Sequence, residues 1–120
     1  MAESKPKAKP LILAVDDDAQ VRSAVRRDLQ THYGKEYQVV VAASGAEALR
    51  TVNQLKQRDA SLALFLVDQR MPEMTGTEFL TEARDLFPDA RKVLLTAYAD
   101  TQAAIDAINK VGLDHYLMKP

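Results

Sequence analysis

The sequence predicts a single α/β domain built on a parallel β-sheet. Short, continuous apolar runs alternate along the chain with segments of helical periodicity, which is typical of strands buried on both faces and joined by crossover helices. Strict alternation implies right-handed crossovers and helices on both faces of the sheet. The chain has 120 residues, which fits one domain, and 47% of them are hydrophobic, which excludes a disordered chain.

Five apolar runs are the expected strands. Residues 1–10, which hold two prolines and three lysines, precede them and are expected to form a flexible tail, leaving residues 11–120 as the folded domain. The fifth run is weaker than the other four. The expected strands are Leu11–Val15, Val39–Ala43, Leu62–Val67, Val93–Leu95 and His115–Met118.

Two helices are expected before the third strand. The first places Val21, Val25 and Leu29 on one face, because they recur every four residues. Asp18 precedes this pattern and is expected to cap the helix. The second helix begins at Ser44–Glu47, which has the spacing of a capping box.

Two further helices are expected after the third strand. Thr75 and Glu78 repeat the capping-box spacing, and Pro88 is expected to close the helix that they open. The fourth helix carries apolar residues within 104–108, and Gly112 is a suitable residue to end it.

Composition excludes several classes of function. With 16 basic and 17 acidic residues, the formal net charge of −1 argues against direct nucleic-acid binding through bulk charge. The chain has no cysteine, which excludes disulfides, thiolate metal sites and thiol catalysis. No apolar run approaches the roughly 20 residues of a membrane span. We therefore expect a cytoplasmic protein without a membrane partner.

Polar residues follow four of the expected strands. Asp16–Asp18 come after the first run, Asp68 after the third, Thr96 after the fourth, and Lys119 at the end of the fifth. In open α/β sheets the ligand site lies beyond the carboxyl ends of the strands. We therefore expect these side chains to gather at one edge of the sheet.

Three of these residues predict a metal site. Asp16, Asp17 and Asp68 would crowd three carboxylates together, and like charges at close range oppose joint ionisation unless a cation is present. Oxygen ligands in small number suit Mg²⁺, and the cluster has no histidine or cysteine to favour zinc. The cofactor predicted from these residues is Mg²⁺.

The same edge of the sheet suits a phosphoryl group. A metal ion and Lys119 would offset negative charge, and Thr96 would donate a hydrogen bond to a phosphoryl oxygen. A carboxylate is the expected nucleophile, because the chain has no cysteine and shows no serine–histidine pairing. Asp68 is the best candidate, since its strand is expected to lie beside the first strand, at the point where the strand order of the sheet reverses.

Four separated motifs resemble the receiver domains of two-component response regulators. They are Ile12–Asp18, Leu66–Gly76, Leu94–Tyr98 and Tyr116–Pro120. The resemblance covers about residues 10–120, and it implies a flavodoxin-like three-layer sandwich whose parallel five-stranded sheet has the order 2-1-3-4-5.

The resemblance also implies how the phosphoryl group is received. Asp68 would accept it from a histidine kinase or a phosphotransfer protein. Asp17 and Asp68 would bind Mg²⁺ directly, together with the backbone carbonyl of Arg70, and Asp16 would act through a bound water.

The remaining roles concern the response to phosphorylation. By resemblance, Lys119 contacts the phosphoryl group, and Thr96 and Tyr116 form a switch pair. Phosphorylation would change the face formed by the fourth strand, the fourth helix and the fifth strand. Such a domain catalyses its own phosphorylation and dephosphorylation but turns over no external substrate, so we expect a signalling switch and not an enzyme.

Two further expectations concern partners and the C-terminus. The run Asp68–Pro72 resembles receivers that precede varied output modules, including thioredoxin-reductase-like flavoproteins, so an output domain or effector is expected outside this chain.

Receivers place a final helix after the Lys-Pro turn, where this chain stops. We therefore expect that helix to be lacking and its apolar contact surface to be covered in a homodimer or a swapped assembly.

Three other classes of protein compete with a phosphorylated receiver. A haloacid-dehalogenase-type phosphatase needs an Asp-x-Asp-x-Thr pattern, and although Asp16 and Asp18 fit, position 20 is glutamine. A nucleotide-binding domain would need a glycine-rich phosphate loop, which this sequence lacks. A pseudo-receiver scaffold usually loses part of the acidic cluster, which is complete here.

Overall fold

The computed structural model describes residues 9–96 and 115–118, and it contains a five-stranded parallel sheet of order β2-β1-β3-β4-β5. The α/β class and the strand order that the sequence predicts are both confirmed. The expected N-terminal tail, apart from its last two residues, the fourth helix and Lys119-Pro120 lie outside the described residues. The strands are β1 (Leu11–Val15), β2 (Gln38–Ala42), β3 (Leu62–Asp68), β4 (Arg91–Thr96) and β5 (His115–Met118).

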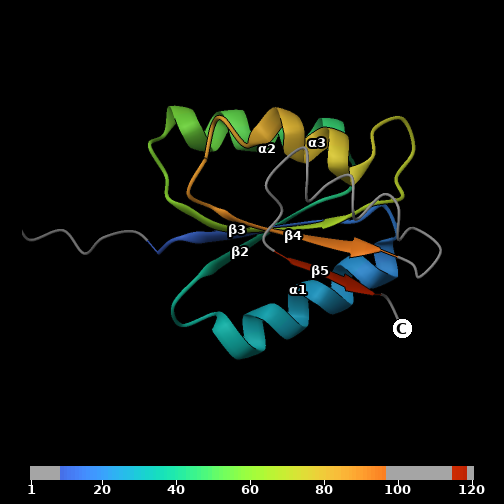
Figure 1. The fold of residues 1–120 in the computed structure, drawn as a ribbon. Coiled ribbons are helices and arrows are strands. Elements are labelled where there is room, and N and C mark those ends of the chain that lie inside the picture. Colours follow the sequence, from blue (N-terminus) through green and yellow to red (C-terminus); the bar gives the residue numbers. More distant parts are fainter. Residues whose placement is uncertain (1–8, 97–114, 119–120) are drawn as a thin grey trace, which may run out of the picture.

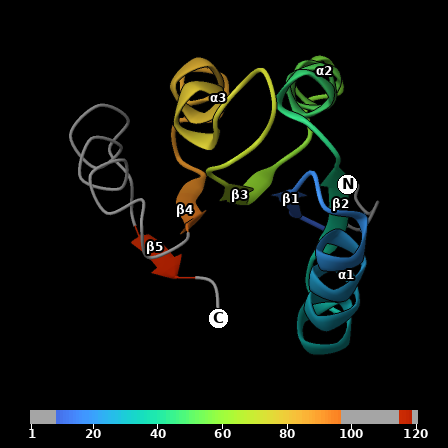
Figure 2. The same ribbon diagram turned by 90° about the vertical axis from the view of Figure 1, so that its right-hand side faces the viewer.

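Three described helices flank the sheet in separate layers. Helices α2 (Gly45–Gln57) and α3 (Gly76–Ala83) cover one face, and α1 (Ala19–Tyr33) lies on the opposite face (Figure 1). The end-on view in Figure 2 shows α1 beneath β1 and β2, with β5 at the far edge of the sheet. No helix within the described ranges is both long and apolar enough to cross a membrane.

Local hydrogen bonds explain where two of the helices begin. Asp18 caps α1, because its Oδ1 accepts hydrogen bonds from the backbone N–H groups of Gln20 (2.9 Å) and Val21 (3.1 Å). At the start of α3, Thr75 and Glu78 form the complete capping box, each side chain accepting from the other residue's backbone N–H. Both caps are therefore confirmed.

The end of α3 differs from the prediction. The helix ends at Ala83 and does not continue to Pro88, because the Leu86 N–H donates to the Ala83 carbonyl only three residues back, at 3.0 Å, and the helical bond from the Phe87 N–H to the same carbonyl is long, at 3.4 Å. These turns direct the Phe87 side chain into the core.

Strand β4 begins earlier than its apolar run. Its first residue, Arg91, pairs with Leu64 of β3, and Lys92 pairs with Phe65. The strand expected from the apolar run leaves out these two charged residues, because backbone pairing, and not hydrophobicity, extends the strand to them.

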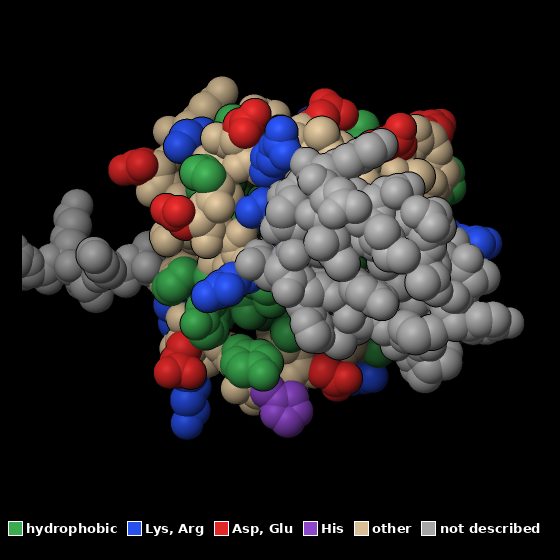
Figure 3. Space-filling view, viewed as in Figure 1, with side chains coloured by type: hydrophobic (Ala, Val, Ile, Leu, Met, Phe, Trp, Pro, Cys, Tyr) green, Lys and Arg blue, Asp and Glu red, His purple; other side chains and the backbone are tan. Residues whose placement is uncertain are grey.

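The main core lies between the sheet and helices α2 and α3. Helix α1, by contrast, has no fully buried residue, and Val21, Val25 and Leu29 are half-buried. Figure 3 shows hydrophobic side chains exposed on the side of the sheet that α1 occupies. The largest fully buried side chains are Phe65, Phe79, Leu13, Leu80, Leu94, Val15, Val52 and Val67.

Candidate functional site

Three carboxylates meet at the carboxyl ends of β1 and β3. One oxygen from each of Asp16, Asp17 and Asp68 can be chosen so that all three lie within 4.8 Å of one another. The side chains of Asp16 and Asp68 are buried, at 4% and 3% exposure, whereas Asp17 is exposed. The parallel sheet thus brings together two segments about fifty residues apart in the sequence, as the pattern of strand ends predicts.

Asp16 is held on both its side chain and its backbone. Its Oδ1 accepts a hydrogen bond from the Asp18 N–H at 2.9 Å, and its backbone carbonyl accepts one from Arg22 Nη1, also at 2.9 Å. Its own N–H donates to the Ala42 carbonyl at 3.2 Å, which continues the pairing of β1 with β2. These contacts fix the turn from β1 into α1, on which Asp17 is presented to solvent.

Asp68 is the last residue of β3 and pairs with Leu95 of β4. Gly76, the first residue of α3, packs against its backbone: a Cβ built on Gly76 would lie 2.5 Å from the Asp68 carbonyl oxygen. The absence of a side chain at Gly76 therefore allows α3 to begin directly beside Asp68.

The donor set fits a hard divalent cation. Two unit charges 4.8 Å apart repel by roughly 3 to 4 kcal/mol at an effective dielectric constant of about 20, so the buried pair Asp16 and Asp68 gains when a cation lies between them. All three side chains offer oxygen donors, which Mg²⁺ and Ca²⁺ prefer. An acidic cluster of this chemistry is consistent with metal binding.

The loop that follows β3 is packed tightly against the protein. Met71 is buried at 7% exposure, and Met74 fills the space above Gly45 at the start of α2, where an added Cβ would lie 2.7 Å from the Met74 sulfur. Glu73 adopts a left-handed backbone conformation with φ of 70°. The burial of Met71 anchors this loop to the core.

Gln69, directly after Asp68, is a functional candidate that sequence reasoning missed. It is 8% exposed, and its side-chain oxygen accepts two hydrogen bonds from Thr77 in α3. The sequence does not predict this contact, because neither helical periodicity nor a capping pattern relates positions 69 and 77.

The predicted switch residues fall on neighbouring strands. Thr96 ends β4, and Tyr116 lies in β5, where it pairs with Leu94. Thr96 pairs with Met118, the residue before Lys119. The backbone thus places the end of β4 beside the end of β5, while Lys119 itself lies outside the described residues.

Comparison with known families adds a second line of evidence. The family model described as "Response regulator receiver domain" matches residues 12–120. Among curated proteins, the hydrogenase transcriptional regulatory protein HoxA of Cupriavidus necator is 34% identical over 109 residues, covering 91% of this chain and 21% of the relative. This chain spans about a fifth of the length of HoxA, and 47% of the length of the transcriptional regulatory protein YhcZ of Bacillus subtilis, which it also matches.

Solved structures give the same picture of the fold. A response regulator from Burkholderia pseudomallei with a phosphorylated aspartic acid, calcium ion and citrate is 28% identical, with a TM-score of 0.78 over 93% of this chain and 61% of that one. The response regulator TrrA of Thermotoga maritima, in complex with Mg²⁺ and BeF, is 30% identical, with a TM-score of 0.71 over 92% of this chain and 87% of that one.

Proposed function

The chain belongs to the response regulator receiver domain family, and on that premise we propose that Asp68 is its phosphoacceptor. The observation that carries this assignment is the convergence of Asp16, Asp17 and Asp68 at the ends of β1 and β3. Receiver domains are signalling switches, which supports the expectation of a switch that turns over no external substrate. The family assignment and the geometry together support Asp68, since it is the cluster member that ends a central strand.

The metal-binding roles follow from the same cluster. Asp17 and Asp68 would bind Mg²⁺ directly together with the backbone carbonyl of Arg70, and Asp16 would act through a bound water. When bound, Mg²⁺ supplies positive charge that offsets the carboxylates and the incoming phosphoryl oxygens. The exposed position of Asp17 supports its role at the mouth of the site.

The proposed reaction is an in-line transfer. A carboxylate oxygen of Asp68 attacks the phosphorus of a phosphohistidine, a new P–O bond forms, and the P–N bond breaks so that the imidazole nitrogen leaves with the bonding electron pair. Hydrolysis reverses the modification: water attacks phosphorus, the P–O bond to Asp68 breaks, and inorganic phosphate and the free carboxylate are released.

The response to phosphorylation would involve residues at the ends of β4 and β5. Lys119 would contact the phosphoryl group, while Thr96 and Tyr116 would form the switch pair. The pairing of β4 with β5 supports this assignment, because it puts the strand ends that carry these residues side by side. The acyl phosphate would bias a two-state equilibrium of this face of the domain.

The proposed partners are a histidine kinase or a phosphotransfer protein and an output domain or effector. HoxA is several times longer than this chain and carries the name of a transcriptional regulator, which supports a linked output. A cytoplasmic location follows, because the ATP from which such kinases draw the phosphoryl group is cytoplasmic. A flavoprotein output and a homodimer or swapped assembly stay predictions.

Incubation with acetyl phosphate or phosphoramidate and Mg²⁺, followed by intact mass spectrometry, tests the proposal. We expect the chain to gain one phosphoryl group, and the Asp68→Asn variant to gain none. A wild-type chain that gains none would instead be a pseudo-receiver scaffold. Sustained turnover of a phosphomonoester would point to a phosphatase.

A further inference from the structure

Gln69 joins the end of β3 to the start of α3 through its side chain. Its Oε1 accepts one hydrogen bond from the Thr77 backbone N–H at 2.9 Å and a second from the Thr77 hydroxyl at 2.8 Å. The Gln69 side chain is almost fully buried. A buried amide that makes two short hydrogen bonds to one residue is held in a single orientation.

The backbone of Gln69 makes two further connections. Its N–H donates to the Leu95 carbonyl at 2.9 Å, so it is tied to β4 one residue before Thr96. Its carbonyl accepts from the Gly76 N–H at 3.1 Å. Gln69 therefore links three elements, β3, β4 and α3, at the edge of the sheet where the carboxylates meet.

These bonds also satisfy the amino terminus of α3. A helix begins with four N–H groups that lack partners within the helix. Here the N–H groups of Gly76 and Thr77 donate to Gln69, whereas those of Thr75 and Glu78 donate to each other's side chains. Gln69 thus supplies half of the acceptors that the helix requires, from outside the helix.

We propose that Gln69 is a positioning residue for the metal and phosphoryl site, an inference that rests on the proposed function. Gln69 stands between two proposed metal ligands, the Asp68 carboxylate and the Arg70 carbonyl. Any rotation of the peptide bonds around Gln69 would move one ligand relative to the other. The four hydrogen bonds prevent this rotation by tying the residue to β4 and α3.

Capping of α3 alone would be a purely structural role, and the two roles differ in what they affect. Loss of a cap lowers the free energy of unfolding but leaves the affinity of the folded protein for Mg²⁺ unchanged. Loss of a positioning residue lowers that affinity. Outer-shell partners of metal ligands typically contribute 10- to 100-fold in affinity or activity.

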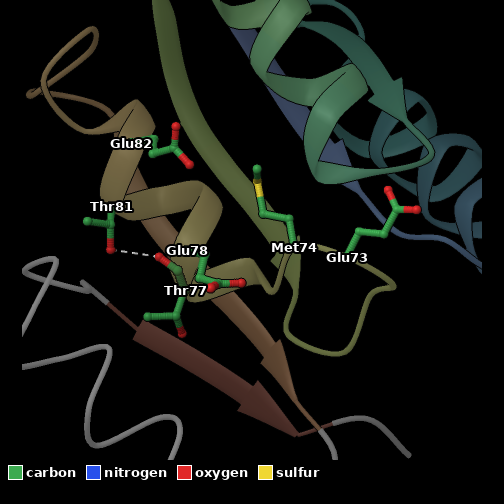
Figure 4. A pocket seen from close by; sticks show the side chains of 6 residues that line it. All are labelled: Glu73, Met74, Thr77, Glu78, Thr81 and Glu82. Atoms are coloured by element: carbon green, nitrogen blue, oxygen red, sulfur yellow. Dashed lines mark hydrogen bonds between the residues drawn. The ribbon is translucent and has the colours of Figure 1, made fainter.

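Three variants separate these roles. Gln69→Met keeps the volume and removes the acceptor, and Thr77→Val removes the hydroxyl but keeps the N–H donor. Thr81→Val is the matched control, because the Thr81 hydroxyl donates to the Thr77 carbonyl at 2.8 Å, one turn further along α3 (Figure 4). It removes a similar hydroxyl from the same helix without touching Gln69.

Calorimetric titration with Mg²⁺, at a temperature where circular dichroism shows each variant folded, gives the primary readout. We expect Gln69→Met to weaken Mg²⁺ binding about tenfold, Thr77→Val to weaken it less, and Thr81→Val to match wild type. With acetyl phosphate, the Mg²⁺ concentration for half-maximal phosphorylation should rise in the same order.

Two outcomes overturn the proposal in different ways. In the first, wild type gains a phosphoryl group, and Gln69→Met and Thr77→Val lower the melting temperature but bind Mg²⁺ with the wild-type affinity. Gln69 is then only a cap, and the proposed function stands. If wild type neither binds Mg²⁺ nor gains a phosphoryl group, the proposed function fails and the role of Gln69 fails with it.

Discussion

Gly76 lies against the backbone of Asp68 so closely that a Cβ on Gly76 would come within 2.5 Å of the Asp68 carbonyl oxygen. The same Cβ would lie 2.9 Å from Cδ1 of Leu94 in β4. The first residue of α3 therefore occupies the narrow space between the ends of β3 and β4. This contact sets how near α3 comes to the proposed phosphoacceptor.

The Gly76→Ala variant should be destabilised although alanine favours helices. Helix propensity alone predicts a gain of about 0.5 to 1 kcal/mol, but overpacking against a backbone carbonyl costs about 1 to 3 kcal/mol. We expect the free energy of unfolding, measured in urea, to fall. Gly45→Ala is the control, since the three atoms nearest to its Cβ would belong to the Met74 side chain and not to a backbone carbonyl, and we expect a smaller loss. Equal losses would contradict the argument.

Replacing Asp17 by asparagine should weaken Mg²⁺ binding at least tenfold, because a proposed direct ligand loses its charge. Asp18→Asn removes the same charge one residue away, yet asparagine caps helices as well as aspartate does. We expect Asp18→Asn to leave the Mg²⁺ affinity, measured by calorimetry, nearly unchanged. Similar losses in both variants would show that net charge, and not the site, controls binding.

The Phe79→Ala variant should lose about 3 to 5 kcal/mol of stability. Phe79 is fully buried, and its ring packs edge-to-face on Phe65 of β3 with 5.7 Å between ring centroids. Tyr33→Ala at the end of α1 serves as the control. Because Tyr33 is 48% exposed, this variant should lose much less stability than Phe79→Ala. Thermal melts followed by circular dichroism would measure both losses.

Lys92→Met should lower the free energy of unfolding by about 1 to 3 kcal/mol. The Lys92 ammonium is buried and donates hydrogen bonds to the carbonyls of Ala90 (3.0 Å) and Pro88 (3.4 Å), which lose this donor in the variant. Lys56→Met is the control, since exposed Lys56 only lies over the Phe87 ring, 5.6 Å from its centroid. A loss at Lys56 as large as at Lys92 would refute the role of burial.

Much of the fold follows from local patterns in the sequence. Continuous apolar runs such as Leu11–Val15 predict strands buried on both faces, and the order of strands and helices restricts the topology. The caps at Asp18 and at Thr75 depend on residues at most three positions apart, so they can be read directly. The end of α3 was predicted wrongly because the turn after Ala83 depends on Phe87 reaching the core.

The sequence by itself determined that the acidic residues stand at strand ends, and a parallel sheet must bring such ends to one edge. Only the tertiary structure decided how the site is held. The loop after Asp68 returns α3 to the end of β3, so that Gln69 meets Thr77 and Gly76 meets the Asp68 backbone. These contacts depend on the path of the loop, because residues eight positions apart become neighbours only when the chain folds back on itself.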